Sequence, residues 1–307
     1  MIDPSLDSRF PDVKHLEEGA RRRIPKFVFE YVRDGTGIYD GIKRNRDALR
    51  HVLFTPRYAC APDGDPEFFT TFLGQTFDAP FGVAPLGLGG LIWPRSAHSL
   101  AKAAKTHNVP FILSNFATAS LEHIAEQAND RAWFQLYPPN IPEIENSHLC
   151  RLKNAGYETL VVTIDTPTAI RRPHDVRNGL SVPPRIDYRS VCQMMVRPRW
   201  SLEQLRYWPL RFENLERYVP TGSSFARRGE FLSDIMEGRI HRDHIASLRD
   251  RWQGKLIVKG VMHPGDAAAC VEVGADAIVV RSGLHRAHHC RLFLGIDLQC
   301  ARCHDDP

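Results

Sequence analysis

The chain has 307 residues, of which 43% are hydrophobic and 25% charged, and this is the composition of a folded globular protein. Forty basic and 36 acidic side chains leave a formal charge of only +4, too little for the field of a dedicated nucleic-acid-binding protein. We therefore expect a small-molecule partner and no nucleic acid.

Two helical stretches are predicted at the start of the chain. The segment 13–37 begins as an amphipathic helix, breaks at Pro25, resumes at Phe27 and stops near Gly35. A polar helical stretch follows over 41–54. The first residues carry no basic-then-apolar signal pattern, and no apolar run is long enough to span a bilayer, so we expect a cytoplasmic protein. Its seven cysteines are expected to be reduced thiols.

From residue 79 onward, short apolar strands alternate with helices. Strands are predicted at 79–87, 109–117, 131–138, 157–167, 255–260 and 275–280. Helices are predicted at 96–108, 120–128, 148–156, 242–252 and 263–274. This alternation indicates an α/β fold whose parallel sheet is covered by helices. An open doubly wound sheet and a (β/α)₈ barrel both fit the periodicity.

Polar residues at the ends of several predicted strands favour the barrel. They are Ser114, Gln135, Tyr137, Thr163, Asp165 and Lys259. Barrel enzymes place their catalytic and binding groups at the C-terminal ends of the strands, where one mouth collects them. We therefore predict a TIM-type (β/α)₈ barrel preceded by an N-terminal helical segment.

The interval 181–239 interrupts the alternation and is expected to be a long irregular loop. Within it, residues 183–212 combine six arginines with aromatic side chains that include Trp200, Tyr207, Trp208 and Phe212. Such a segment is typical either of a basic solvated loop over the barrel mouth or of a peripheral contact with an anionic membrane.

Seven segments of the chain together resemble the FMN-dependent 2-hydroxy-acid dehydrogenase and oxidase family. They are RRRIPKFVFEYVRDGTG, NRDAL, APFGVAPLGLGGL, FILSNFATASLEHIA, WFQLY, GYETLVVTIDTPTAIRRPHDVRNGL and KLIVKGVMHPGDAAACVEVGADAIVV. The resemblance covers most of 14–280 and implies a single barrel domain over 1–307 with FMN across its mouth. It also implies a homo-oligomer.

The resemblance assigns cofactor-binding residues. The loop Ala84, Pro85, Leu86 and Gly87 matches the backbone that contacts the flavin ring. Ser114, Gln135 and Thr163 match the groups that hydrogen-bond the polar edge of the ring. Lys259 matches the lysine that stabilises negative charge on the reduced flavin.

The resemblance also assigns substrate-binding and catalytic residues. Arg172, Tyr31 and Tyr137 match groups that hold the carboxylate and the reacting oxygen of a small 2-hydroxy acid. Asp165 matches the aspartate that orients a catalytic histidine. The implied reaction oxidises an L-2-hydroxy acid, such as lactate, glycolate or mandelate, to a 2-oxo acid. Oxygen, a quinone or a cytochrome remain alternative electron acceptors.

The family pattern fails after the strand that ends at Val280. The family's histidine base falls at Gly283, and its second arginine falls at Arg286. His285 lies two residues beyond the base position and is the candidate substitute. Because general base catalysis is worth about 10²- to 10⁴-fold, we predict an inactive or very slow enzyme. The alternative is an inactive family member that acts at most as a binding or oligomerisation module.

Residues 281–307 form an atypical tail. The last two βα units of the family and their phosphate-binding elements have no counterpart in it, so the barrel is expected to be incomplete, with about six βα units. The sequence CARCH at 300–304 fits a haem attachment pattern, and nearby cysteines and histidines are potential zinc ligands. Without a signal peptide or a haem-domain pattern, we interpret the tail as an aberrant terminus and predict no metal.

Overall fold

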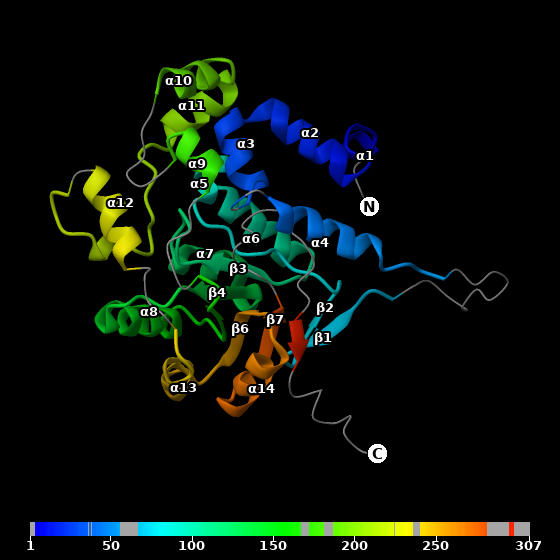
Figure 1. The fold of residues 1–307 in the computed structure, drawn as a ribbon, viewed down its shortest axis with the longest axis vertical. Coiled ribbons are helices and arrows are strands. Elements are labelled where there is room, and N and C mark those ends of the chain that lie inside the picture. The colour runs from blue at the N-terminus through cyan, green and yellow to red at the C-terminus, as the bar shows by residue number, and fades with distance from the viewer. Residues whose placement is uncertain are drawn as a thin grey trace.

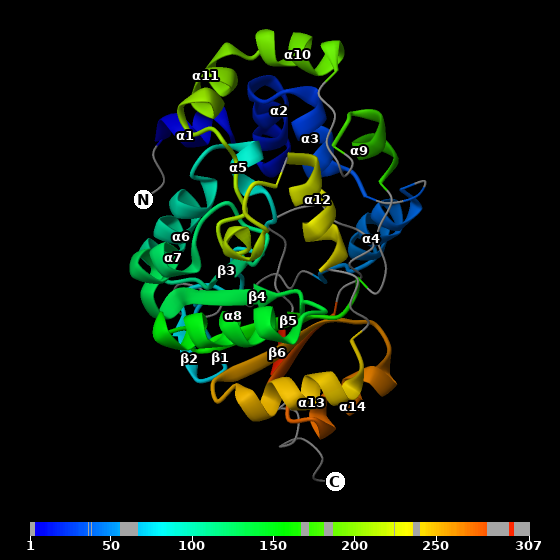
Figure 2. The ribbon, with the colours of Figure 1, turned by 90° about the vertical axis from the view of Figure 1, so that its left-hand side faces the viewer.

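The computed structural model describes residues 4–35, 37, 39–55, 67–166, 172–180, 187–223, 225–235, 240–280 and 295–297. In this part of the chain, helices surround one parallel sheet (Figure 1). Helices α1 (Pro4–Arg9), α2 (Val13–Arg23), α10 (Tyr188–Met195) and α11 (Pro198–Arg206) lie at one end of the molecule. Helices α13 (Arg242–Arg251) and α14 (Pro264–Glu272) lie at the other end (Figure 2).

The N-terminal helices follow the predicted pattern. Asp12 caps α2 by accepting a hydrogen bond from the His15 backbone N–H at 2.8 Å. The chain breaks at Pro25, and α3 (Lys26–Arg33) resumes and buries Phe27, Val28 and Phe29. Helix α4 (Asp40–Arg50) follows. A hairpin that the sequence analysis missed, β1 (Thr70–Phe72) and β2 (Gln75–Phe77), precedes the main sheet.

Five parallel strands occur in the order in which they appear in the chain: β3 (Phe111–Ser114), β4 (Ala132–Leu136), β5 (Thr159–Thr163), β6 (Lys255–Val261) and β7 (Ala277–Val280). A doubly wound sheet reverses its strand order at a switch point, whereas a barrel does not. The sequential order therefore confirms the barrel-type fold. Among the described strands the sheet has two ends and does not close, so the barrel is incomplete in the part of the chain that the structure describes.

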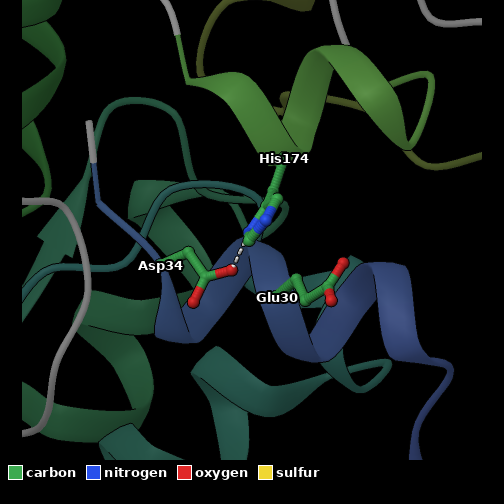
Figure 3. Close-up of side chains that lie close together, drawn as sticks. All are labelled: Glu30, Asp34 and His174. Carbon is green, nitrogen blue, oxygen red and sulfur yellow. Dashed lines mark hydrogen bonds and ion pairs between the residues drawn. The ribbon is translucent and has the colours of Figure 1, made fainter. Parts of the chain in front are cut away.

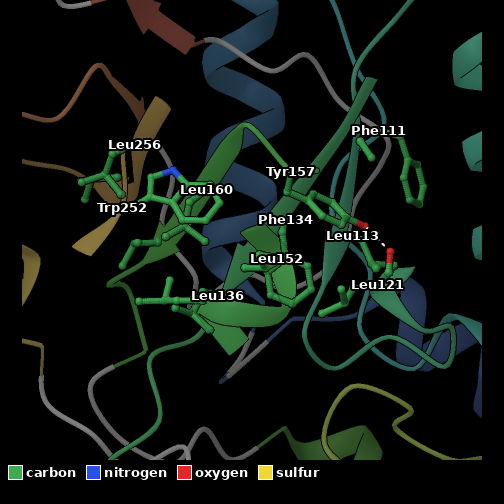
Figure 4. Close-up of a cluster of buried hydrophobic side chains, with 14 of the residues drawn as sticks. Phe111, Leu113, Leu121, Phe134, Leu136, Leu152, Tyr157, Leu160, Trp252 and Leu256 are labelled. Carbon is green, nitrogen blue, oxygen red and sulfur yellow. Dashed lines mark hydrogen bonds between the residues drawn. The ribbon is translucent and has the colours of Figure 1, made fainter. Parts of the chain in front are cut away.

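The two faces of the sheet bury different side chains, because neighbours along a strand point to opposite sides. The outer face packs against the crossover helices α6 (Ser96–Thr106), α7 (Leu121–Ala128), α8 (Pro142–Asn154), α13 and α14. Figure 4 draws part of this cluster, including Leu121 of α7 and Leu152 of α8. The inner face holds a separate cluster formed by Ile112, Trp133, Val161, Ile257 and Ala277. Leu73 and Phe77 of the hairpin pack into the same cluster, so the hairpin fills one end of the barrel interior.

Two expectations for the strands and loops need correction. The segment 79–87, predicted as a strand, forms only a single parallel bridge between Val83 and Phe111. The short helix α5 (Gly89–Ile92) follows it. The interval expected to be an irregular loop contains α10, α11 and α12 (Phe225–Asp234), with a 3₁₀ turn at Glu216–Tyr218. Trp200 of α11 is buried and donates from Nε1 to the carbonyls of Leu91 and Ile92, both at 3.1 Å. Tertiary contacts of this kind stabilise helices that a polar sequence does not predict.

Only three residues of the tail are described. Strand β8 (Gly295–Asp297) pairs antiparallel with β7, so it does not continue the parallel barrel. The remainder of 281–307, including the CARCH sequence, lies outside the described residues. Within the described part, no helix is both long and apolar enough to traverse a bilayer.

Candidate active site

The carboxyl ends of four neighbouring strands bring four polar side chains together on the inner face of the sheet. We call Ser114, Gln135, Thr163 and Lys259 the polar layer. Ser114 is paired in register with Gln135, and Thr163 with Lys259. Gln135 links the two pairs, because its Nε2 donates to the Thr163 hydroxyl at 2.5 Å. Each of the four side chains lies two residues beyond an apolar side chain of the inner cluster on the same strand.

All four members of the polar layer are buried, with at most 4% of each residue exposed. Buried polar groups are costly unless they are paired. The Ser114 hydroxyl accepts a hydrogen bond from the Phe116 N–H at 3.2 Å, and the Lys259 ammonium lies 3.6 Å from the Asp165 carboxylate. The layer is therefore a preorganised set of hydrogen-bonding groups at the barrel mouth.

Asp165 occupies a position that only a glycine opposite it permits. Gly260 has φ +109°, and a Cβ added there would lie 2.5 Å from the Cβ of Asp165. The Asp165 side chain is only 5% exposed, and neither of its carboxylate oxygens has a hydrogen-bond donor among the described residues. A buried carboxylate in this state is an acceptor for a further donor, which is what a carboxylate that orients a histidine requires.

The predicted backbone loop Ala84, Pro85, Leu86 and Gly87 lies next to the end of β3. The Leu88 N–H that follows it donates to the Phe116 carbonyl at 2.8 Å. A Cβ at Gly87 would lie 3.3 Å from the Cβ of Phe116. Close packing against Phe116 therefore gives a reason for glycine at this position that is independent of any ligand.

Tyr31 and Arg172 come together although 140 residues separate them in the chain. The Arg172 guanidinium lies 5.1 Å from the centre of the Tyr31 ring. It donates to the carbonyls of Tyr31 and Asp34 at 2.7 and 2.5 Å, and to the Asp175 carboxylate at 2.7 Å. The Tyr31 hydroxyl donates to the Gly87 carbonyl at 3.2 Å. Arg172 thus ties the end of α3 to α9 (Pro173–Arg177), and its Nε has no partner among the described residues.

Asn115 is a site residue that the sequence analysis missed. It is buried directly after Ser114, and its side-chain amide donates to the Tyr137 carbonyl at 3.3 Å and accepts from the Tyr137 N–H at 3.5 Å. The ring of Phe116 lies edge-on to the Tyr137 ring at 5.7 Å. An asparagine just after an apolar strand often forms hydrogen bonds with nearby backbone groups, so the sequence SNF at 114–116 could have indicated this role.

Glu30, Asp34 and His174 form the group whose donor atoms, all within 4.8 Å of one another, are spaced for a metal ion (Figure 3). His174 Nδ1 contacts an Asp34 oxygen directly. Glu30 accepts from Asn178 at 2.8 Å and lies 3.4 Å from the Lys26 ammonium. Since both carboxylates already have partners, the group works as a link between α3 and α9, and we assign no metal to it.

Three residues of the predicted catalytic loop, Gly283, His285 and Arg286, lie outside the described residues. Of the other predicted site residues, the polar layer and Asp165 form one connected set. Gln135 reaches Thr163, and Lys259 reaches Asp165. Tyr31, Arg172 and the loop 84–87 form a second set, joined by the Tyr31 hydroxyl.

Comparisons with known proteins agree on one family. The profile of the family described as FMN-dependent dehydrogenase matches residues 20–283. The (S)-mandelate dehydrogenase of Pseudomonas putida is 30% identical over 282 residues, covering 92% of this chain and 70% of the relative. An L-lactate dehydrogenase of Pseudomonas syringae pv. syringae is 31% identical over 262 residues, covering 85% of this chain and 68% of the relative.

Solved structures agree with the sequence comparisons on the family. A crystal structure of the monotopic membrane protein (S)-mandelate dehydrogenase superimposes with a TM-score of 0.83 at 30% identity, covering 89% of this chain and 72% of that one. A Mycobacterium tuberculosis relative, 34% identical over 275 residues, is covered to 63% of its length. The chain thus spans about two thirds of the length of these curated relatives.

Proposed function

The chain belongs to the FMN-dependent dehydrogenase family, and from this premise we propose that it binds FMN over the polar layer and oxidises an L-2-hydroxy acid to a 2-oxo acid. The observation that carries the proposal is the buried, hydrogen-bonded set Gln135, Thr163 and Lys259, with Ser114 beside it. Lactate, glycolate and mandelate are the proposed substrate candidates.

The residues present fit the polar edge of a flavin ring. Gln135 and Thr163 offer an amide and a hydroxyl, groups that both donate and accept hydrogen bonds. Lys259 supplies a fixed ammonium, and Gly260 removes bulk beside Asp165. When bound, FMN accepts the two electrons that leave the hydroxy acid. The ammonium of Lys259 then stabilises the negative charge that accumulates nearby, without needing to reorganise.

The substrate would be held by the second set of residues. Arg172 presents a guanidinium suited to a carboxylate, with Tyr31 against its face. Its hydrogen bonds to backbone carbonyls position it, and its Nε provides a further donor. Tyr137 is held by Asn115 through its backbone and would contact the reacting oxygen. Arg286 would supply the second carboxylate contact.

The proposed rate is low. The family's base position holds Gly283, so His285 is the proposed substitute acceptor of the substrate proton. Asp165 would stabilise the resulting imidazolium, because its buried oxygens offer acceptors. The second candidate function is that of a family member that binds FMN or other subunits without turnover. Gly283 favours it, because glycine offers no side chain that could accept the proton.

The test uses the full chain refolded or expressed with FMN. We expect the bound flavin to show its visible absorption bands and to bleach slowly with lactate, glycolate or mandelate under anaerobic conditions. Changing His285→Ala should abolish the bleaching but leave the absorption bands. Bands without bleaching would select the binding-module alternative, whereas no flavin binding would contradict the FMN proposal and leave only the subunit-binding form of the alternative.

Two further properties belong to the proposal. The segment 183–212 is proposed to contact a membrane peripherally, since α10 and α11 expose Met195, Leu202 and Leu205. The solved relative named a monotopic membrane protein supports this. A homo-oligomer is proposed by family membership, and light scattering of the purified chain tests it.

A further inference from the structure

A basic groove lies between the N-terminal helices and the junction of α10 with α11, and none of its lining residues belongs to the candidate active site. It encloses about 660 Å³, within the roughly 300–1,000 Å³ usual for ligand sites. Helices α1 and α2 contribute Arg9, Arg22 and Arg23, and the start of α11 contributes Arg197 and Arg199. These segments meet at one end of the molecule (Figures 1 and 2).

The groove carries a strong excess of positive charge. Five arginines line it, and Glu18 is its one acidic side chain. None of the five arginines forms an ion pair with any residue that the structure describes. The N-terminus of α11 adds the partial positive charge of its free backbone N–H groups, and no side chain caps it. The electrostatics favour an anionic ligand.

Contacts hold the two walls in place without a ligand. The Arg23 guanidinium lies over the Trp93 ring at 4.5 Å, and Arg197 donates from Nε to the Ile24 carbonyl at 3.3 Å. Because these contacts join α2 to α5 and to the α10–α11 junction, the groove is preformed, which reduces the entropy lost on binding.

The rim of the groove is apolar and exposed. Leu16 of α2 and Val196 of the junction both line it, and they are 52% and 64% exposed. Next to Val196, Met195 is 73% exposed, and α11 continues with the exposed Leu202 and Leu205. Arginines flanked by exposed aliphatic side chains suit a ligand with an anionic head and an apolar body.

We propose that this groove binds the phosphate headgroup of an anionic phospholipid, while Val196, Met195 and Leu16 contact the acyl region at the membrane surface. This inference rests on the proposed membrane contact of 183–212 and deepens it in two ways. It makes the N-terminal helices half of the contact surface, and it makes the contact selective for anionic lipid.

The experiment compares sedimentation of the full chain with phosphatidylcholine vesicles and with mixed phosphatidylcholine–phosphatidylglycerol vesicles. We expect strong binding only to the mixed vesicles, weakened by salt. The double variant Arg22→Gln with Arg199→Gln should lower the partition coefficient about 10- to 30-fold, at about 1 kcal/mol for each charge near the surface. Arg22→Lys with Arg199→Lys should retain most of the binding.

The matched control removes two positive charges elsewhere. Lys43→Gln with Arg44→Gln changes exposed residues of α4 and should change the partition coefficient less than threefold. Thermal unfolding midpoints of all variants show whether they fold.

Equal binding to both kinds of vesicle, unaffected by the Arg22 and Arg199 changes, would overturn the headgroup site and leave the membrane contact of 183–212 intact. Equal losses in the groove variant and the α4 control would also overturn the site, because only net charge would then matter. No binding to either kind of vesicle would overturn both membrane proposals and would leave the FMN proposal untouched.

Discussion

Two layers of side chains on the inner face of the same strands differ in chemistry. The layer nearer the strand starts is apolar and consists of Ile112, Trp133, Val161 and Ile257, closed off by Phe77 of the hairpin. Two residues further along each strand come Ser114, Gln135, Thr163 and Lys259, which are equally buried but polar. Both layers depend on the same register between strands.

The difference in chemistry between the two layers assigns stability to the apolar layer and binding to the polar layer. Burial of the apolar layer contributes to stability through area removed from water and close packing. Burial of the polar layer contributes little net free energy, since each hydrogen bond replaces one made to water. The polar layer is therefore expected to contribute to ligand binding and the apolar layer to stability.

Removing the largest side chain of the apolar layer should have the largest effect. Trp133 is 2% exposed, and Phe72 and Phe77 lie 6.1 Å from its ring. We expect Trp133→Ala to lower the free energy of unfolding by about 3–5 kcal/mol, because it leaves a cavity. Urea unfolding followed by circular dichroism measures this. A loss below about 1 kcal/mol would mean that the apolar layer does not stabilise the fold.

Making the polar layer apolar should lower FMN affinity and leave stability nearly unchanged. The double variant Gln135→Leu with Thr163→Val removes both partners of one hydrogen bond, so the free energy of unfolding should change by less than about 1 kcal/mol. FMN affinity, measured by quenching of flavin fluorescence, should fall by about 1–3 kcal/mol, or roughly 5- to 150-fold.

The control for this variant makes the same kinds of substitution at exposed positions, Gln253→Leu with Thr71→Val. FMN affinity should not change in the control. If the polar-layer variant bound FMN as tightly as the unchanged chain, the assignment of Gln135 and Thr163 to the flavin would be wrong.

A buried histidine on the outer face should affect stability alone. His148 packs beside Phe134 of β4, and burial lowers its pKa to about 4. The unfolded chain, with a pKa of 6.5 at this residue, binds more protons between these values, so stability is full above pH 6.5 and falls as the pH drops toward 4. We expect His148 to contribute a loss of about 2 kcal/mol between pH 7 and pH 5.

The variant His148→Asn keeps a donor for the Ile144 carbonyl, which His148 Nδ1 contacts at 2.9 Å. Its unfolding free energy should show a flatter dependence on pH over this range, with unchanged FMN affinity. An equal pH slope in the variant and the unchanged chain would assign the acid sensitivity to other groups.

The smallest effect is expected at Asn115, which joins β3 to the loop that holds Tyr137. Asn115→Ala leaves the Tyr137 backbone groups without their side-chain partner, so unfolding should become easier by about 1 kcal/mol. FMN affinity should change less than twofold, because Asn115 is not in the polar layer. A loss of FMN affinity as large as that of the Gln135 and Thr163 variant would place Asn115 among the flavin-binding groups.

Elements with strong local signals could be predicted from the sequence. The helices at 242–251 and 264–272 follow their apolar periodicity, with proline at the start of the second, and β6 contains the apolar run 256–258. The short hairpin and helices α10 to α12 could not be predicted. Their sequences are polar or brief, and they are stabilised by distant contacts, such as the donation from Gln204 to the Gly90 carbonyl at 2.8 Å.

By itself the sequence determined strands β3 to β7, the helices between them and the polar residues near the ends of four of these strands, because side-chain periodicity and proline and glycine positions act locally. Only the tertiary structure decided that the strand order is sequential and that Gln135 reaches Thr163. It also decided that Gly260 makes room for Asp165 and that Arg172 is tied to the end of α3. These facts depend on strand register and on contacts between residues far apart in the chain, and no local pattern encodes them.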